Sequence, residues 1–129
     1  MDFNNDKPVY RQILDLCHSR IISGQWKNDE RIPSVRELGL ELKVNAHTVL
    51  KAYDELQVEG VIVQRRGVGF FLTGDARQRV MDALRSEFIF EVLPTVFERM
   101  ASYGITLDEI VEQYELYHHG EFAKNNPEQ

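Results

Sequence analysis

The sequence of 129 residues contains one cysteine, Cys17, and no long apolar run. A single cysteine cannot form a disulfide within the chain, which fits a reducing cytoplasm. A membrane-spanning helix needs about 18 apolar residues, so none is expected, and the polar, acidic start MDFNNDKP does not resemble a secretory signal. Hydrophobic residues still make up 43% of the chain, enough for a packed core. We expect a cytoplasmic protein of one domain plus an appendage, without membrane contact.

The sequence also lacks the motifs of common catalytic sites. It has no Gly-rich phosphate loop, nucleophile elbow or paired metal motif. The candidate catalytic or metal-binding groups are four histidines, His18, His47, His118 and His119. The last two are adjacent and diverge by about 100° on a helix, so they are poorly placed to share a metal. Cys17 and His18 fall in a helical pattern, where Cys17 is expected to be a core residue. We predict no catalysis, no cofactor and no metal.

Positive charge is scarce and unevenly distributed. The net charge is −6, which at first argues against a nucleic-acid partner. Residues 1–73 carry 10 Lys/Arg and 10 Asp/Glu, whereas residues 74–129 carry 5 and 11. This asymmetry suggests that the first part meets a polyanion and the second does not. It is a weak signal alone, because a nucleic-acid binder usually has a clearly basic face.

The first thirty residues predict one amphipathic helix and a polar connection. Asn5 or Asp6 fits the N-cap, with Pro8 at an early position, and Gly24 fits the C-terminal cap. The apolar stripe of this helix is Val9, Ile13, Leu16, Cys17 and Ile21. Trp26 is expected to anchor the connection, and Arg31-Ile32 fits a very short strand.

Two helix-start signals follow. Ser34 and Glu37 fit an S-x-x-E capping box, and Asn45 fits the N-cap of a further helix that Gly60 ends. Only a few residues separate the two helices, as a helix-turn-helix requires. On the second helix the face that points inward consists of Val49, Ala52, Tyr53 and Leu56, and the opposite face carries His47, Lys51 and Asp54. This outer face is mildly basic at its start and acidic at its end, so the charge order favours docking on DNA through the N-terminal turns.

A hairpin pattern comes next. Residues 61–63 and 70–72 are rich in β-forming types and flank the sequence Arg65-Arg66-Gly67-Val68-Gly69. For a lone hairpin a solvated loop would be the simpler interpretation of the two arginines. Directly after a helix-turn-helix, they suit phosphate contact or insertion into a narrow minor groove. The sequence therefore predicts a mainly α fold with a small β-hairpin, a winged helix-turn-helix over residues 1–74.

Residues 75–129 predict a short all-α region. Apolar positions recur every four residues from Ala76 to Met100, on a helix that Pro94 should kink or divide near Val92 and that Gly104 ends. Thr106 and Glu109 fit a second capping box, before a last helix and a frayed tail from residue 120.

Two such helices cannot build a core alone, so their apolar faces need a partner surface. That surface could be the first domain of the same chain or a second copy. We favour a homodimer, because palindromic operators call for paired readers. The residues expected in the dimer interface are Val80, Leu84, Phe88, Val92, Val96, Ile110 and Tyr114.

Residues 8–72 resemble the N-terminal domain of the GntR family of bacterial regulators. The matching motifs are P-V-Y-x-Q-I, I-x-S-G, R-I-P-S-V-R-E-L, V-N-x-x-T-V-x-K-A-Y-x-E-L, E-G and R-G-x-G-F-F. Their forms and the short tail look like the YtrA subfamily, whose members often control transport operons. The resemblance implies DNA contacts from Ser34, Arg36, Asn45, Ala46, His47, Thr48, Leu50, Arg66 and Gly67. From charge and position we add Lys51 and Arg65.

The chain departs from the family pattern at two positions. Many GntR members have guanine-reading arginines where this sequence has Ala46 and Leu50. Small and apolar side chains cannot make that bidentate contact, although they could meet a thymine methyl while His47 and Lys51 supply polar contacts. We therefore expect an operator that differs from the common GntR sequence.

The resulting hypothesis is a homodimeric transcriptional repressor that binds double-stranded DNA. The alternative is a winged helix that binds protein, which the overall acidity favours and the set Arg36, Lys51, Arg65 and Arg66 does not. Aromatic residues of the tail could line a ligand pocket, but aromatics at helical spacing are more often core or interface. We expect no tightly bound small-molecule effector.

Overall fold

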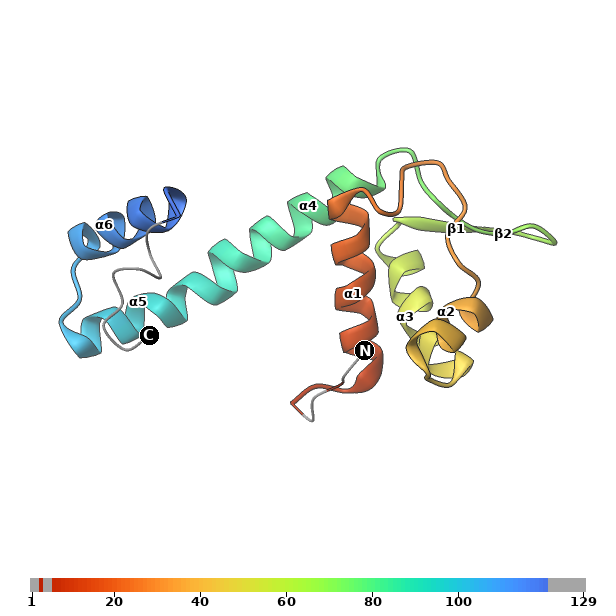
Figure 1. Ribbon diagram of the computed structural model, residues 1–129, viewed down its shortest axis with the longest axis horizontal. Helices are drawn as coiled ribbons and strands as arrows, with labels where there is room; N and C mark the ends of the chain where they lie inside the picture. Colours follow the sequence, from red (N-terminus) through yellow and green to blue (C-terminus); the bar gives the residue numbers. More distant parts are fainter. Residues whose placement is uncertain (1–2, 4–5, 121–129) are drawn as a thin grey trace. The chain divides into compact units, whose positions relative to one another are not determined.

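A computed structural model describes residue 3 and residues 6–120 of the chain (Figure 1). The chain divides into two compact units, unit 1 (Met1–Arg85) and unit 2 (Ser86–Gln129). Unit 1 contains three helices, a two-stranded hairpin and most of a fourth helix, and unit 2 is helical. The predicted fold class, mainly α with a hairpin wing, is confirmed. No helix in the described part of the chain is long and apolar enough to cross a membrane.

Helix α1 (Val9–Ser23) begins later than the sequence predicted. Its N-cap is Pro8, which has no capping side chain but whose carbonyl accepts hydrogen bonds from the N–H groups of Arg11 and Gln12. Asp6 lies two residues before this cap, so its carboxylate does not occupy the N-cap position; Asn5 lies outside the described residues. At the other end, Gly24 has the expected left-handed conformation (φ 82°).

Helices α2 (Val35–Leu42) and α3 (Ala46–Val58) form the helix-turn-helix. Their predicted N-caps, Ser34 and Asn45, are confirmed. The turn is tight because Lys43 adopts a left-handed conformation and the Val44 N–H donates to the Gly39 carbonyl at 2.9 Å. A Cβ on Gly39 would lie only 2.9 Å from the Val44 carbonyl oxygen, so this glycine permits the close approach of turn and helix.

The wing consists of β1 (Ile62–Arg65) and β2 (Gly69–Leu72), paired antiparallel (Figure 1). The residues before α2 lie along β2. The Ile32 N–H donates to the Phe70 carbonyl at 2.9 Å, and the Leu72 N–H donates to the Glu30 carbonyl at 3.0 Å. The expected short strand at Arg31-Ile32 is thus a single bridge from Arg31 to Phe71, and it attaches the wing to the start of the helix-turn-helix.

The core of unit 1 lies between these elements. Its fully buried members include the predicted inward face of α3, together with Ile13, Cys17, Ile21, Leu38, Val61 and Leu72. Tyr53 packs edge-to-face on Phe70 with ring centroids 5.1 Å apart, and its hydroxyl donates to the Pro33 carbonyl at 2.6 Å. Burial raises the pKa of the Cys17 thiol to about 12, so Cys17 is a core residue with little thiolate at neutral pH.

Helix α4 (Ala76–Glu87) closes this core at its first turns. Ala76 and Val80 are buried in it, and Leu84 packs partly buried against it. Two hydrogen bonds hold the helix there: the Arg77 side chain donates to the Ile22 carbonyl at 2.9 Å, and the Arg77 N–H donates to the Asn28 side chain. Val80, which the sequence pattern placed in the dimer interface, is instead buried in the core of unit 1, and its side chain is already covered there.

Unit 2 contains the π-helical segment η1 (Phe88–Val92) and helices α5 (Leu93–Tyr103) and α6 (Leu107–His118). Pro94 has no N–H to offer the helical ladder, and the backbone before it widens to a π-turn in which the Leu93 N–H bonds to the Phe88 carbonyl. The helix that Pro94 was expected to kink or divide near Val92 changes there from the π-helical segment to α5. Gly104 ends α5 in a left-handed conformation, and the Thr106–Glu109 capping box starts α6 as expected. The frayed tail was predicted mostly for residues 121–129, which lie outside the described part.

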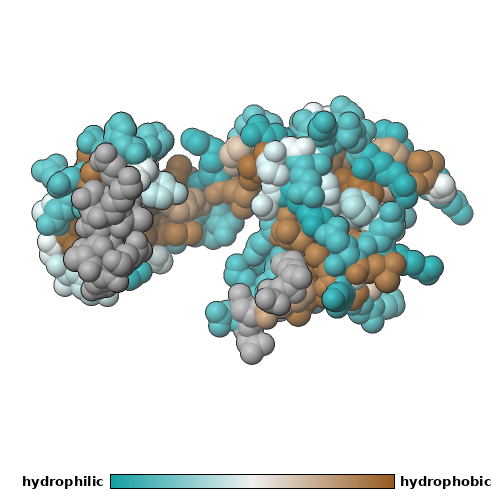
Figure 2. Space-filling model, in the orientation of Figure 1, coloured by the Kyte–Doolittle hydropathy of each residue, from teal (hydrophilic) through white to brown (hydrophobic). Residues whose placement is uncertain are grey.

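No side chain among residues 86–120 is buried. Large apolar residues remain exposed along all three segments, and Figure 2 shows hydrophobic surface in this part of the chain. They are Phe88, Ile89, Phe90, Val92, Phe97, Tyr103, Ile105, Leu107, Ile110, Val111, Tyr114 and Tyr117. Helices α5 and α6 share a hollow of about 150 Å³, to which both Ile105 and Ile110 contribute. The helices of unit 2 thus contact one another without forming a core.

Candidate nucleic-acid interface

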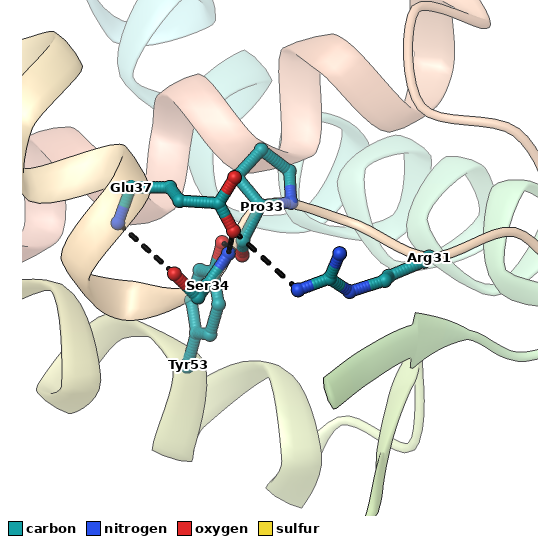
Figure 3. Close-up of polar contacts among 5 residues, drawn as sticks. All are labelled: Arg31, Pro33, Ser34, Glu37 and Tyr53. Atoms are coloured by element: carbon teal, nitrogen blue, oxygen red, sulfur yellow. Dashed lines mark hydrogen bonds and ion pairs between the residues drawn. The ribbon is translucent and has the colours of Figure 1, made fainter. Parts of the chain in front are cut away.

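The N-terminus of α2 is fixed by a reciprocal pair of hydrogen bonds (Figure 3). The Glu37 N–H donates to Ser34 Oγ at 3.0 Å, and the Ser34 N–H donates to the Glu37 carboxylate at 3.1 Å. The second bond favours the charged carboxylate and lowers the pKa of Glu37. Ser34 Oγ accepts here, so its own hydroxyl hydrogen stays available for an acceptor such as a phosphate oxygen. Pro33, held by Tyr53, places this turn against α3.

The first turns of α3 carry most of the residues predicted to read bases. Asn45 accepts a hydrogen bond from the His47 N–H through Oδ1 at 2.8 Å, so its carbonyl oxygen is committed to the cap. His47 and Leu50 are exposed, and Ala46 and Thr48 are partly exposed. These five residues lie on two consecutive turns, with the side chains of Val49 and Ala52 turned into the core. The structure therefore brings the predicted base-reading residues together.

A shallow apolar hollow of about 130 Å³ lies between the N-terminal turns of α2 and α3. Val35 of α2 and Ala46, His47 and Leu50 of α3 line it. Val35, the first residue of α2, is partly exposed at this hollow. The hollow could not be predicted from either helix alone, because both helices contribute to it.

Lys51 is exposed on α3, but its ammonium group has a partner within the chain. Lys51 Nζ lies 4.1 Å from the ring centroid of Tyr10 on α1, a cation–π distance. Arg36, on the first turn of α2, is exposed, and no carboxylate in the described part of the chain pairs with it. Arg36 is thus the less restrained cation of the two.

The wing separates its two arginines. Arg65 belongs to β1, pairs with Gly69, and holds its guanidinium 4.1 Å from the Phe71 ring centroid. Arg66 and Gly67 occupy the turn, where Gly67 has φ 78° and the Val68 N–H donates to the Arg65 carbonyl. Only Arg66 and Gly67 of the three predicted wing residues therefore stand at the tip.

Arg31 is a cation at this surface that the sequence analysis did not assign. It lies beside β2, between the wing and the start of α2 (Figure 3): a Cβ on Gly69, the first residue of β2, would lie 2.8 Å from Arg31 Nε. Its guanidinium is 3.5 Å from the Glu37 carboxylate, a weak ion pair between half-exposed groups. Its place follows from the pairing of residues 30–32 with β2, and the short-strand pattern at Arg31-Ile32 does not reveal which strand is the partner.

Among the described residues, no three His, Cys, Asp or Glu side chains are grouped to hold a metal ion. His18 is paired with Glu59 at the end of α3 at 2.8 Å, which joins α1 to the recognition helix. His118 stacks on Tyr114. His18 and His118 thus each have a partner within the chain.

Comparison with known proteins identifies the relatives of the chain. Residues 9–72 match the gntR family of bacterial regulatory proteins. Over 118 residues the chain is 31% identical to the HTH-type transcriptional regulator YhcF of Bacillus subtilis, covering 92% of this chain and 96% of the relative. It is 30% identical over 112 residues to the HTH-type transcriptional repressor YtrA of the same bacterium, covering 87% and 85%. Both matches extend beyond the winged helix into the C-terminal helices.

Two solved structures are similar as well. A GntR-family regulator from Bacteroides thetaiotaomicron has a TM-score of 0.75 at 32% identity, covering 88% of this chain and 99% of that one. The DNA-binding domain of AraR in complex with operator ORR3 has a TM-score of 0.51 at 29% identity, covering 57% of this chain and 88% of that one. The second of these was solved on its DNA.

Proposed function

Because the chain belongs to the GntR family and is a DNA-binding transcriptional regulator, we propose that it represses transcription as a homodimer on an inverted-repeat operator. The observation that carries this proposal is the contrast between a packed winged helix and the exposed apolar residues of unit 2. We further propose that the regulated genes include a transport operon, as in the YtrA subfamily.

Unit 2 supplies the proposed dimer contact. Its apolar side chains lie on η1, α5 and α6, and several are large aromatics that remain about half exposed or more. A stable protein–protein interface buries about 800 Å² on each partner and is enriched in such residues. A second copy of the same chain meets this need with a self-complementary surface. We assign Phe88, Val92, Val96, Ile110 and Tyr114 of unit 2 to this contact, and add Leu84 of α4, which belongs to unit 1 and is only partly buried there; Val80 is left out.

Unit 1 supplies the proposed DNA contact. The first turns of α3 enter the major groove, where Ala46, His47 and Leu50 meet base edges. Arg36, Arg66 and Arg31 contact phosphates or the neighbouring minor groove and fix the register. In a dimer two recognition helices occupy successive major grooves about 34–36 Å apart. Occupancy of a promoter by the dimer then blocks transcription. Repression, as opposed to activation, is supported by the relative YtrA, which is named a transcriptional repressor.

The experiment is selection of bound sequences from a random duplex pool at two salt concentrations. We expect an inverted repeat whose affinity falls steeply with salt, because phosphate contacts release counterions. Absence of enrichment, with weak binding that vanishes near physiological salt, would contradict operator binding. It would favour the alternative in which the winged helix binds a protein.

Two variants separate the phosphate contacts, which fix the position of the protein on the DNA, from the recognition of bases. Arg65→Ala/Arg66→Ala should weaken binding to all sequences alike and reduce the salt slope by about one to two, whereas Arg99→Ala in unit 2 should leave the slope unchanged. His47→Ala should relax the base preference in the selected motif. Unchanged affinity in the first variant, or an unaltered motif in the second, would refute the respective assignment.

A further inference from the structure

The hollow between α2 and α3 lies where the DNA-binding face needs a base-reading surface. Three of its four lining residues, Ala46, His47 and Leu50, belong to the first two turns of the recognition helix. The fourth, Val35, is the first residue of α2. In a helix-turn-helix the N-terminal residues of the recognition helix contact base edges. The hollow therefore opens toward the major groove in the DNA complex proposed above.

The chemistry of the lining limits what can occupy the hollow. Val35, Ala46 and Leu50 offer no hydrogen-bonding side chain, so they cannot satisfy the N4 amino group of cytosine, the N6 amino group of adenine or the acceptors of guanine. Placing any of these polar groups there would leave it without a partner, at a cost in affinity. The apolar group that B-DNA presents in the major groove is the C5-methyl group of thymine. The hollow, with a volume of about 130 Å³, has room for a methyl group, because roughly 10–15 Å³ measured with a probe already holds one water molecule.

We propose that the Val35–Ala46–Leu50 hollow binds the C5-methyl group of one thymine in each operator half-site, and that Leu50 is a specificity-determining residue. Leu50 is 36% exposed, so contact with a methyl group removes apolar surface from water on both partners. The His47 side chain lines the same hollow and stays exposed, which places a polar group beside the base that carries the methyl. This inference rests on the proposed operator binding and specifies which base feature unit 1 reads.

The test replaces thymines of the selected operator by deoxyuridine, one pair of symmetric positions at a time. Uracil keeps the pairing and the O4 acceptor of thymine and lacks only the methyl group. We expect one pair of positions at which the Kd rises about fourfold for each half-site, the factor typical of one buried methylene-sized group. The other thymines should tolerate the exchange. Fluorescence anisotropy with the full-length protein at fixed salt measures each Kd.

A double-mutant cycle then assigns the effect to the hollow. In Leu50→Ala the thymine and uracil duplexes should bind with nearly equal affinity at the sensitive position. Val35→Ala should reduce the discrimination in the same way from the other helix. Val58→Ala is the matched control, because Val58 lies on α3 with 84% of its surface exposed and does not line the hollow. It should retain the full discrimination.

The outcomes separate this inference from the proposed function. Salt-dependent binding to an inverted repeat with no uracil-sensitive position would overturn the methyl contact and leave operator binding intact. The same holds if Leu50→Ala keeps the wild-type ratio of the two affinities. Failure to recover any specific duplex would instead contradict the proposed function, and the methyl contact with it.

Discussion

Units 1 and 2 begin and end their helices with the same local devices but differ in what those helices bury. Each has a reciprocal capping box, Ser34–Glu37 in unit 1 and Thr106–Glu109 in unit 2, and each has a helix ended by a left-handed glycine. Unit 1 also buries side chains from α1, α2, α3, both strands and α4. None of the residues 86–120 is buried. Local signals therefore define helices in both units, whereas only unit 1 has a core of its own.

The comparison separates two tasks within one short chain. Isolated helices are marginal in water, and most of their stability in proteins comes from packing an apolar face. Unit 1 meets this requirement internally, so its surface is free to read DNA. The helices of unit 2 do not bury their apolar faces within the unit, which suits a surface that assembles two copies. The proposed dimer thus follows from what unit 2 lacks.

The largest expected effect comes from the core of unit 1. Leu56→Ala should lower the free energy of unfolding by about 2–5 kcal/mol, because Leu56 is fully buried and its truncation leaves a cavity. Urea denaturation followed by circular dichroism measures the change. Val58→Ala on the same helix should change stability by less than about 0.5 kcal/mol. Similar losses in both variants would show that unit 1 has no well-packed core around α3.

The second effect concerns the apolar surface of unit 2. Phe88→Asp should weaken dimerisation at least tenfold, because a charge would be buried at the proposed contact without a partner. Sedimentation equilibrium measures the dissociation constant, and the circular dichroism spectrum should report that unit 1 stays folded. Ser86→Asp adds the same charge two residues earlier, about 200° around the helix, and should leave the constant nearly unchanged. Equal effects of the two variants would contradict a specific interface at Phe88.

The third effect compares the loss of the capping box in unit 1 with the loss of the capping box in unit 2. Ser34→Ala and Thr106→Ala each remove a side-chain cap that typically contributes about 1 kcal/mol. The loss of stability in Ser34→Ala should be independent of protein concentration, since Ser34 belongs to unit 1, which has its own core. The loss from Thr106→Ala should appear as weaker dimerisation, because α6 is stabilised mainly by its partner. A dimerisation constant unaffected by Thr106→Ala would separate α6 from the interface.

The smallest effect is a pH dependence confined to unit 1. The Ser34 N–H lowers the pKa of Glu37 in the folded protein, so the ionised carboxylate stabilises the fold above the ordinary glutamate pKa of 4.5. That contribution should be lost as the pH falls through the lowered value. Glu37→Gln should lack this part of the acid sensitivity. The free energy of unfolding is measured against pH for the wild type and for Glu37→Gln. The difference between the two curves gives the contribution of Glu37 alone, because Asp75, whose pKa is also lowered, is present in both proteins. If the stability of the two proteins changed with pH in parallel, the stabilising role of the ionised Glu37 carboxylate would be contradicted.

Sequence patterns predicted the elements whose signals are local. The caps at Ser34, Asn45 and Thr106, the glycine ends of α1 and α5, and the buried face of α3 each depend on residues within a few positions of one another. The interruption before Pro94 also follows from one residue. These features define the winged helix-turn-helix and the two C-terminal helices.

Features that depend on distant contacts could not be predicted in this way. Val80 continues the apolar period of its helix, but the hydrogen bond from Arg77 to Ile22, 55 residues away, turns the start of α4 onto unit 1. Arg31 lies on the wing because the segment before α2 pairs with β2, far along the chain. The apolar hollow needs Val35 and Leu50 from separate helices. In each case the tertiary contact decides the role of the residue.

The most direct test of the difference between the units is the mass of the full-length protein in solution and on its selected operator. Sedimentation at micromolar concentration should give twice the 15.0 kDa of one chain, and the complex should contain two chains for each inverted repeat. In Phe88→Asp the free protein should sediment as a monomer that keeps the circular dichroism of a folded unit 1. A wild-type protein that stays monomeric, both free and on the operator, would contradict the account.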